Sequence, residues 1–183
     1  MKPLNLVVSD DIIIKSWDIK DASKLFALTD ANRDHLITWF NWLPKTQSVV
    51  DSEKFIANAL VEQADDKSLE MGIWQNGKLV GCIGLHDISL ENHRAAIGYW
   101  LDKDHLKQGI ITNSVKTIIQ HCFTTLNLNR LEITATTINK PSFSIAEKLG
   151  FTREGVARQY DFINGQYLDY IHYSLLQSEY IKL

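Results

Sequence analysis

The chain has 183 residues, of which 19 are basic and 22 acidic, so its formal net charge is −3, and 45% of its residues are hydrophobic. These proportions are ordinary for a globular protein and fit one domain, which we expect to span residues 1–183. The longest near-continuous apolar runs, 79–85 and 95–101, are far shorter than the roughly 18 residues of a membrane-spanning helix. No basic run is present either. The composition therefore argues against a membrane partner and against direct nucleic-acid binding.

Three further absences shape the expectations. Residues 1–5 lack the basic start of a secretory signal, which favours a cytoplasmic protein. Cys82 and Cys122 lie far apart and outside any ligand-spacing motif, so neither a disulfide framework nor a metal site is predicted. The dinucleotide-binding pattern GxGxxG is also missing, which excludes the corresponding fold.

The first third of the sequence predicts one strand followed by helices. Isoleucines at 12–14 indicate a strand. A helix is expected over 18–29, where acidic residues precede apolar residues at helical spacing. A second, shorter helix is predicted over 36–43, with Pro44 ending it. Serine and aspartate at 48 and 51 then resemble a capping box before a third helix.

From Leu69 onward the hydrophobic period changes and strands dominate. Asn76-Gly77 and Asn164-Gly165 are strong hairpin signals, each between two alternating segments. In order, the expected elements are strands 69–75, 78–88 and 94–101, a helix ending near Leu126, a strand 131–137, a helix 139–149, and strands 158–163 and 166–176. This order predicts a mixed α/β (α+β) protein with a largely antiparallel sheet and one strand–helix–strand crossover.

The most informative local feature is the start of the long helix at Gly109. Backbone N–H groups in the first turn of a helix are unsatisfied and carry the positive end of the helix dipole. A glycine at this point lets a phosphate approach the backbone closely. The alternative is that Gly109 only makes a turn.

A second feature is the pair Asn139 and Ser142 at the start of the next predicted helix. Residues three apart at a helix start can face the same side and could act together. The alternative is simple capping of the helix by Asn139.

In combination, these features resemble the GNAT superfamily of acetyl-CoA-dependent N-acetyltransferases, and most closely its RimJ/RimL-like branch, which acetylates the N-terminal amine of ribosomal proteins. The resemblance covers essentially the whole chain. It rests on IGYWLDKDHLKQGIIT (97–112), LNRLEI (128–133), NKPSFSIAEKLGF (139–151) and EGVARQYDFINGQYLDYIHYSLL (154–176). It implies the GNAT fold, in which two central parallel strands, here 97–101 and 130–137, splay apart.

The resemblance further implies that acetyl-CoA is the co-substrate and that no metal takes part. Its pantetheine arm would lie between the two splayed strands, and its pyrophosphate on the amides of the loop and helix start. The cofactor-binding residues implied in this way are Tyr99, Trp100, Leu101, Leu106, Lys107, Gln108, Gly109, Ile110, Ile111, Thr112 and Asn139. Leu106 and Ile111 depart from the family pattern, which has a polar and a small residue at these positions, and we expect binding to be weakened at most.

Two residues match catalytic positions of the resembling branch. Ser142 matches the hydroxyl that protonates the leaving thiolate, and Asp161 matches a carboxylate assigned as general base. An α-amine has an ordinary pKa near 8, so it needs only modest help to lose its proton. A water chain is therefore the alternative to Asp161 as the base.

The resemblance leaves the function open between three possibilities. We expect the N-terminal α-amine of a protein, with a ribosomal protein suggested by the branch. The alternatives are a small amine (a polyamine, an amino acid derivative or an aminoglycoside) and a non-catalytic acyl-CoA-binding module, which Leu106 suggests. The terminal hairpin also offers strand edges that could pair in a homodimer.

Several aromatic and histidine residues have two interpretations. Trp39, Phe40 and Trp42 are expected in the core, although in this superfamily their segment forms one wall of the acceptor cleft. His86 and His172 lie on predicted strands and are expected to be structural.

Overall fold

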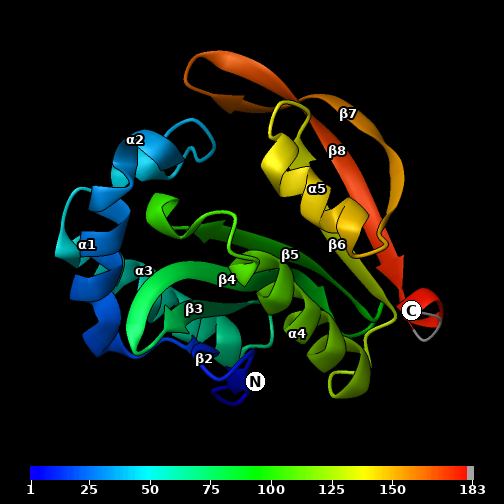
Figure 1. Cartoon of the computed structure of the whole chain (residues 1–183), viewed down its shortest axis with the longest axis horizontal. Coiled ribbons are helices and arrows are strands. Elements are labelled where there is room, and N and C mark those ends of the chain that lie inside the picture. Colours follow the sequence, from blue (N-terminus) through cyan, green and yellow to red (C-terminus); the bar gives the residue numbers. More distant parts are fainter. Residues whose placement is uncertain (181–183) are drawn as a thin grey trace.

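The computed structural model describes residues 1–180, which form a central eight-stranded sheet (Figure 1). In spatial order the strands are β1 (Asn5–Val7), β2 (Ile12–Ser16), β3 (Leu69–Gln75), β4 (Lys78–Ser89), β5 (Arg94–Leu101), β6 (Arg130–Thr136), β8 (Gln166–Leu176) and β7 (Thr152–Ile163). Neighbouring strands are antiparallel except β5 and β6, which are parallel. The sheet is therefore the mixed, mostly antiparallel one that the sequence predicts.

Six helices accompany the sheet within the described residues. They are α1 (Ala22–Ala31), α2 (Arg33–Leu36), α3 (Val49–Ala64), α4 (Ile110–Thr124), α5 (Lys140–Lys148) and α6 (Gln177–Tyr180). The predicted capping box at Ser48 is present, because Asp51 Oδ2 accepts the Ser48 backbone N–H at 3.0 Å. No helix in residues 1–180 is long and apolar enough to cross a membrane.

The strands alternate their side chains between two apolar cores, one on each face of the sheet. On β4, Ile83 and Leu85 pack in the core that also contains α4 and part of α5. Cys82, which directly precedes Ile83 and therefore points to the opposite face, packs in the second core with α1 and α3. Helices therefore cover both faces, and each face of β5 has different neighbours.

The parallel pair β5–β6 holds together only at one end. Residues 94–96 pair with 130–132, and beyond them β5 remains paired with β4 while β6 remains paired with β8. Figure 1 shows the two strands diverging, with α5 on the side of β6. Each strand thus presents a row of backbone N–H and C=O groups to the gap between them.

The structure also corrects several expectations. The helix predicted over 36–43 is limited to Arg33–Leu36, and Pro44 lies inside a short 3₁₀ turn, Leu43–Lys45, where its missing N–H costs nothing. Strand β7 begins at Thr152 rather than at 158, because two register shifts interrupt its alternation. Strand β1 and helix α6 were not predicted, since both are too short to carry a periodic signal.

Candidate active site

A cavity of about 350 Å³ lies in the gap between β5 and β6. Its walls bring together predicted site residues that are up to 62 positions apart in the sequence, from Tyr99 to Asp161. The predicted residues that line it are Tyr99, Trp100, Leu101, Leu106, Ile111, Asn139, Ser142 and Asp161. Lys107, Gln108, Gly109, Ile110 and Thr112 lie in the adjoining loop and first turn of α4 and do not line it.

The start of α4 has the geometry that anion binding requires. Gly109 has a φ of +78°, in the left-handed region, and directly precedes the first helical residue. The first intrahelical hydrogen bond runs from Asn113 N to Gly109 O at 3.0 Å, so the amides of residues 110–112 remain available. The Ile110 side chain is buried in the core, and Ile110 can therefore contribute only its N–H.

The loop before α4 is fixed by polar contacts at Asp102, which is 6% exposed. Its Oδ2 lies 2.9 Å from His105 Nδ1, and the neighbouring Lys103 N–H donates to Asn32 Oδ1 at 2.8 Å. Burial by itself raises the pKa of Asp102, but hydrogen bonds outweigh it and hold the pKa below its ordinary value. An ionised carboxylate therefore fixes the short turn Lys103–His105 that leads into the loop before α4.

Two hydroxyl groups meet where α5 faces β5. Asn139 Oδ1 accepts the Ser142 N–H at 3.3 Å, which sets the first turn of α5. Tyr99 OH donates to Ser142 O at 3.0 Å, and Ser142 Oγ lies 3.5 Å from Tyr99 OH. Burial raises the pKa of Tyr99 to about 12, so its hydroxyl keeps its proton at neutral pH. The wall of the gap therefore carries two adjacent proton-bearing oxygens.

Asp161 lines the same cavity at an irregular point of β7. Its Oδ1 accepts the N–H of Phe162 at 2.8 Å and lies 3.4 Å from Asn41 Nδ2, while its Oδ2 accepts Tyr170 OH at 3.3 Å. These three donors fix the orientation of the Asp161 carboxylate. Burial and the Asp161 charge together raise the pKa of Tyr170 to about 12, so Tyr170 remains a donor.

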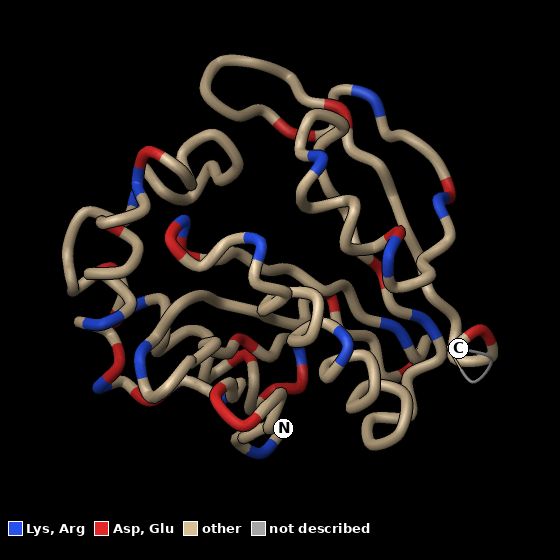
Figure 2. The backbone as a smooth tube through the Cα atoms, in the orientation of Figure 1, with Lys and Arg blue, Asp and Glu red and all other residues tan. Residues whose placement is uncertain are grey.

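The loop after α2 and the β7–β8 hairpin approach each other across the open end of the gap. Asn164 Nδ2 donates to Ile37 O at 2.8 Å, in addition to the contact between Asn41 and Asp161. Segments 36–44 and 162–168 contain no charged residue, and Figure 2 shows both stretches without charge colours. Among the residues that the structure describes, Asp161 is therefore the one charged group at the contact between these two uncharged segments.

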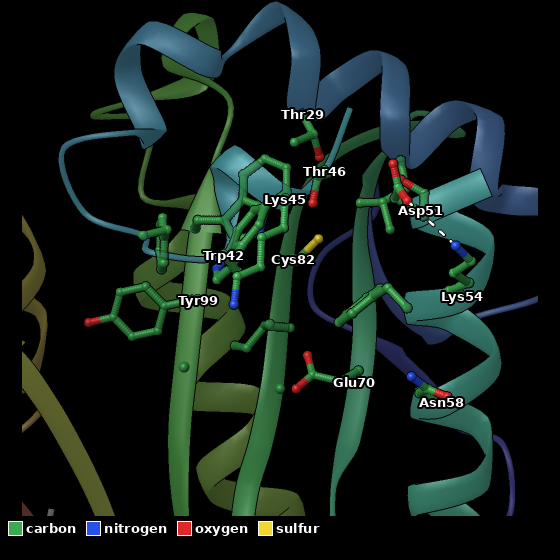
Figure 3. A pocket seen from close by; sticks show the side chains of 18 of the residues that line it. Thr29, Trp42, Lys45, Thr46, Asp51, Lys54, Asn58, Glu70, Cys82 and Tyr99 are labelled. Atoms are coloured by element: carbon green, nitrogen blue, oxygen red, sulfur yellow. Dashed lines mark ion pairs between the residues drawn. The ribbon is translucent and has the colours of Figure 1, made fainter. Parts of the chain in front are cut away.

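A larger cavity, about 700 Å³, lies on the other face of β5 (Figure 3). It shares Phe40, Gly98, Tyr99 and Trp100 with the smaller cavity, so the two adjoin along β5. Its remaining walls come from α1, the segment after α2, α3, β3 and β4. In Figure 3 the Tyr99 side chain points away from this cavity, toward the side where Ser142 lies.

The larger cavity is lined by Glu70, which the sequence did not assign to a site, and by His86, which it predicted to be structural. His86 Nδ1 lies 2.9 Å from Glu70 Oε1, and both residues line the cavity. Phe40 and Trp42 also line it and are only half-buried, so the core interpretation is wrong and the alternative, a position in a cavity wall, agrees with the structure. Trp39 lies in the wall of the smaller cavity instead. One feature of the sequence could have indicated this cavity. Glycine lies inside two strands, at 84 and 98, and such a glycine marks a position where other atoms approach the backbone closely.

Comparison with known proteins agrees with this geometry. The family model described as "Acetyltransferase (GNAT) domain" matches residues 11–152. The chain is 35% identical to the putative ribosomal N-acetyltransferase YdaF of Bacillus subtilis, over 94% of this chain and 95% of the relative. It is 31% identical to the ribosomal-protein-serine acetyltransferase of Escherichia coli, over 88% and 90%. It is also 30% identical to the spermidine N(1)-acetyltransferase of Escherichia coli, over 58% and 57%.

Solved structures give the same fold. The chain aligns with the microcin C7 self-immunity acetyltransferase MccE in complex with acetyl-CoA and AMP at a TM-score of 0.88 and 29% identity, covering 92% of this chain and 94% of that one. RimL, the ribosomal L7/L12 α-N-protein acetyltransferase in complex with coenzyme A, aligns at a TM-score of 0.93 and 23% identity, covering 96% and 99%. Within residues 1–180 no group of three side chains is placed to hold a metal ion.

Proposed function

The chain belongs to the acetyltransferase (GNAT) domain family and is an acetyl-CoA-dependent N-acetyltransferase, and from this premise we propose that residues 1–183 form one domain that acetylates the α-amine at the N-terminus of a protein. The observation that carries the proposal is the gap between β5 and β6, where Ser142 and Asp161 line one cavity with the backbone of Tyr99–Leu101. A ribosomal protein, met in the cytoplasm, is the acceptor that the relatives' names suggest.

The residues of the gap fit the co-substrate. Acetyl-CoA supplies a thioester whose carbonyl carbon is attacked by the acceptor amine, and the CoA thiol leaves. Backbone groups of Tyr99, Trp100 and Leu101 are free of β6 and would hold the pantetheine arm, and Asn139 would support it from the start of α5. The amides of residues 106–112 would hold the pyrophosphate at the positive end of α4.

The chemistry needs an acid, a base and stabilisation of the developing oxyanion. A backbone N–H near Trp100 or Leu101 would stabilise the oxyanion. Ser142 would donate a proton to the leaving thiolate and regain one from solvent water, while Tyr99 OH, which accepts the Ser142 hydroxyl, holds that hydroxyl in place. Asp161 would bind the incoming amine and receive its proton, directly or through a water.

Release of free CoA thiol from acetyl-CoA tests the proposal. We expect turnover with a peptide that has a free N-terminus and none with the same peptide blocked at its N-terminus. Asp161→Asn is expected to lower kcat/KM for the free peptide by about ten-fold or more, because the variant keeps the size of the side chain and removes its charge and basicity. Asp10→Asn, at an exposed aspartate outside both cavities, is the matched control. Turnover confined to amines without a peptide would overturn the proposal.

The second candidate is acetylation of a small amine. It is favoured by one observation, the 30% identity to a spermidine N(1)-acetyltransferase, which covers 58% of this chain. The thiol assay separates the two candidates when spermidine and an aminoglycoside are run beside the peptides. Binding of acetyl-CoA without turnover of any amine would instead favour an acyl-CoA-binding module. A homodimer paired through the edge of β7 is a further proposal, and sedimentation of the free protein tests it.

A further inference from the structure

We propose that the larger cavity binds the group next to the acceptor amine and selects a bulky, apolar, preferably aromatic group without positive charge. This inference rests on the proposed function, because it names which α-amines the site accepts. The preferred acceptor is a protein N-terminus whose first residue has a large apolar side chain, in place of a small N-terminal residue or a polyamine.

The position of the cavity supports this role. It adjoins the gap between β5 and β6 along Gly98, Tyr99 and Trp100, so an amine placed near Asp161 and Ser142 has its substituent within reach of the larger cavity. A volume of about 700 Å³ is far larger than a serine or alanine side chain needs. The space therefore fits a large side chain together with part of the backbone that follows it.

The walls of the cavity favour an aromatic occupant. Phe40 and Trp42 come from the segment after α2, Phe55 from α3 and Trp100 from β5. Phe40 and Trp42 already pack against each other, with ring centroids 5.3 Å apart and planes inclined at 37°. Aromatic rings gain from such tilted contacts in addition to the burial of their surface.

The floor of the cavity is a polar pair seated on two glycines. Glu70, Gly84 and Gly98 lie side by side across β3, β4 and β5. A Cβ atom at Gly84 would lie 2.5 Å from Glu70 Oε2, and one at Gly98 would lie 2.7 Å from His86 Nε2. Any side chain at either glycine would therefore displace the pair. Because His86 Nδ1 faces Glu70, Nε2 is the nitrogen left to donate to a carbonyl oxygen of the acceptor.

The charges of the cavity disfavour a polycation. Its two carboxylates are Asp51 and Glu70, and both already have partners. Asp51 Oδ2 accepts hydrogen bonds from the N–H and the hydroxyl of Ser48, and Glu70 contacts His86. Lys45 and Lys54 also line the cavity, so no excess of negative charge remains to bind a second ammonium group. The uncharged segments 36–44 and 162–168 agree with an apolar acceptor.

The test compares two peptides that differ only in the first residue, phenylalanine or serine, with spermidine as the polycation. We expect kcat/KM for the phenylalanine peptide to exceed that for the serine peptide by about ten-fold or more, since an aromatic side chain leaves water. Trp42→Ala is expected to reduce this ratio to within about three-fold, whereas Tyr180→Ala, at a half-buried aromatic on α6 that packs on Phe123 outside both cavities, leaves it unchanged. Calorimetric binding of both peptides to the CoA complex gives the same comparison without turnover.

The outcomes are distinguishable. A preference for phenylalanine that Trp42→Ala removes would support the inference. Equal or better use of the serine peptide would overturn the inference and leave N-terminal acetylation standing. Turnover of spermidine alone would overturn both. A preference for phenylalanine that survives in Trp42→Ala and also in Phe55→Ala would place the selecting group elsewhere and would overturn the assignment of this cavity.

Discussion

The two cavities beside β5 differ in what builds them. The smaller one depends on backbone: β5 and β6 part after three residue pairs, and the first amides of α4 are free. The larger one depends on side chains from helices and strands that are distant in sequence. Backbone groups suit a co-substrate whose phosphates and amides are constant, whereas side chains can differ to suit one acceptor. Changes in the smaller cavity should therefore alter the rate of acetyl transfer and the binding of acetyl-CoA. Changes in the larger cavity should alter the binding of the acceptor.

The largest expected effect is on chemistry in the smaller cavity. Ser142→Ala should lower kcat by about a hundred-fold at nearly unchanged KM values, because the thiolate then leaves without a positioned proton donor. Ser144→Ala, two residues along α5, is the matched control and should alter kcat less than about two-fold. Steady-state kinetics measure both. Equal losses in the two variants would show that α5 packing, and not the Ser142 hydroxyl, is responsible.

A second change tests the backbone of the smaller cavity. Gly109→Ala should raise the KM for acetyl-CoA by about ten-fold, because its φ of +78° costs an alanine about 1–2 kcal/mol and the loop shifts to relieve it. The nearest atom to the new Cβ, Asn113 Nδ2, would be 3.8 Å away, so no clash contributes. Gly77→Ala is the control, since Gly77 has a φ of +77° in a hairpin far from the site. A similar rise in KM in both variants would contradict an anion site at α4.

A third change tests the larger cavity through pH. Burial lowers the pKa of His86, but the hydrogen bond and charge of Glu70 on β3, aided by Asp87 on β4 and Glu62 on α3, raise it above its ordinary value. Protonated His86 donates to the acceptor, so acceptor binding should be strongest below this pKa and weaken as pH rises through it.

Glu70→Gln should move that loss of acceptor binding to lower pH and raise the acceptor KM by about three-fold at neutral pH. The KM for acetyl-CoA should not change. Acceptor binding to the CoA complex, measured from about pH 5.5 to about 8.5, gives the shift. Asp87→Asn is the control. It should shift the pH at which acceptor binding is lost by less, because Asp87 raises the pKa of His86 less than the contacts with Glu70 do. An unchanged pH dependence in Glu70→Gln would contradict a role for His86.

The smallest effect is expected at the closed end of the gap, outside both cavities. Arg130 donates to both Glu154 oxygens at 2.7 and 2.6 Å, which, with Ser174, lowers the pKa of Glu154 to about 2. This stabilisation is fully present above the ordinary pKa of 4.5 and is lost as pH falls toward 2. Because the Glu154 side chain is 40% exposed, the contribution is on the order of 1 kcal/mol.

Glu154→Gln should therefore lower the free energy of unfolding at neutral pH by about 1 kcal/mol, and the difference from the unaltered protein should shrink on acidification. Urea unfolding at several pH values measures it. Glu53→Gln, an exposed residue of α3, should change stability by less than about 0.5 kcal/mol. A difference that persists undiminished at low pH would show that packing of the side chain, and not its charge, is lost.

Local signals predicted much of the fold. Strands β3, β5 and β8 begin and end at the predicted residues, because alternation and Asn-Gly turns fix them without distant partners. Helix α5 likewise follows from Asn139, Pro141 and Gly150. The register shifts in β7 escaped prediction because a bulge is specified by the partner strand.

The order of strands and helices along the chain and the helix start at Gly109 follow from the residues themselves, because each depends on neighbouring residues and on backbone geometry, whereas the splayed pair is what the resemblance to the GNAT superfamily implies. The packing of separate elements, in contrast, brings Asp161 and Ser142 to one cavity and places Glu70 against His86 on a floor of glycines. The reason is physical: these contacts join separate elements. Their distances are set by how helices and strands pack, which no local pattern of residues encodes.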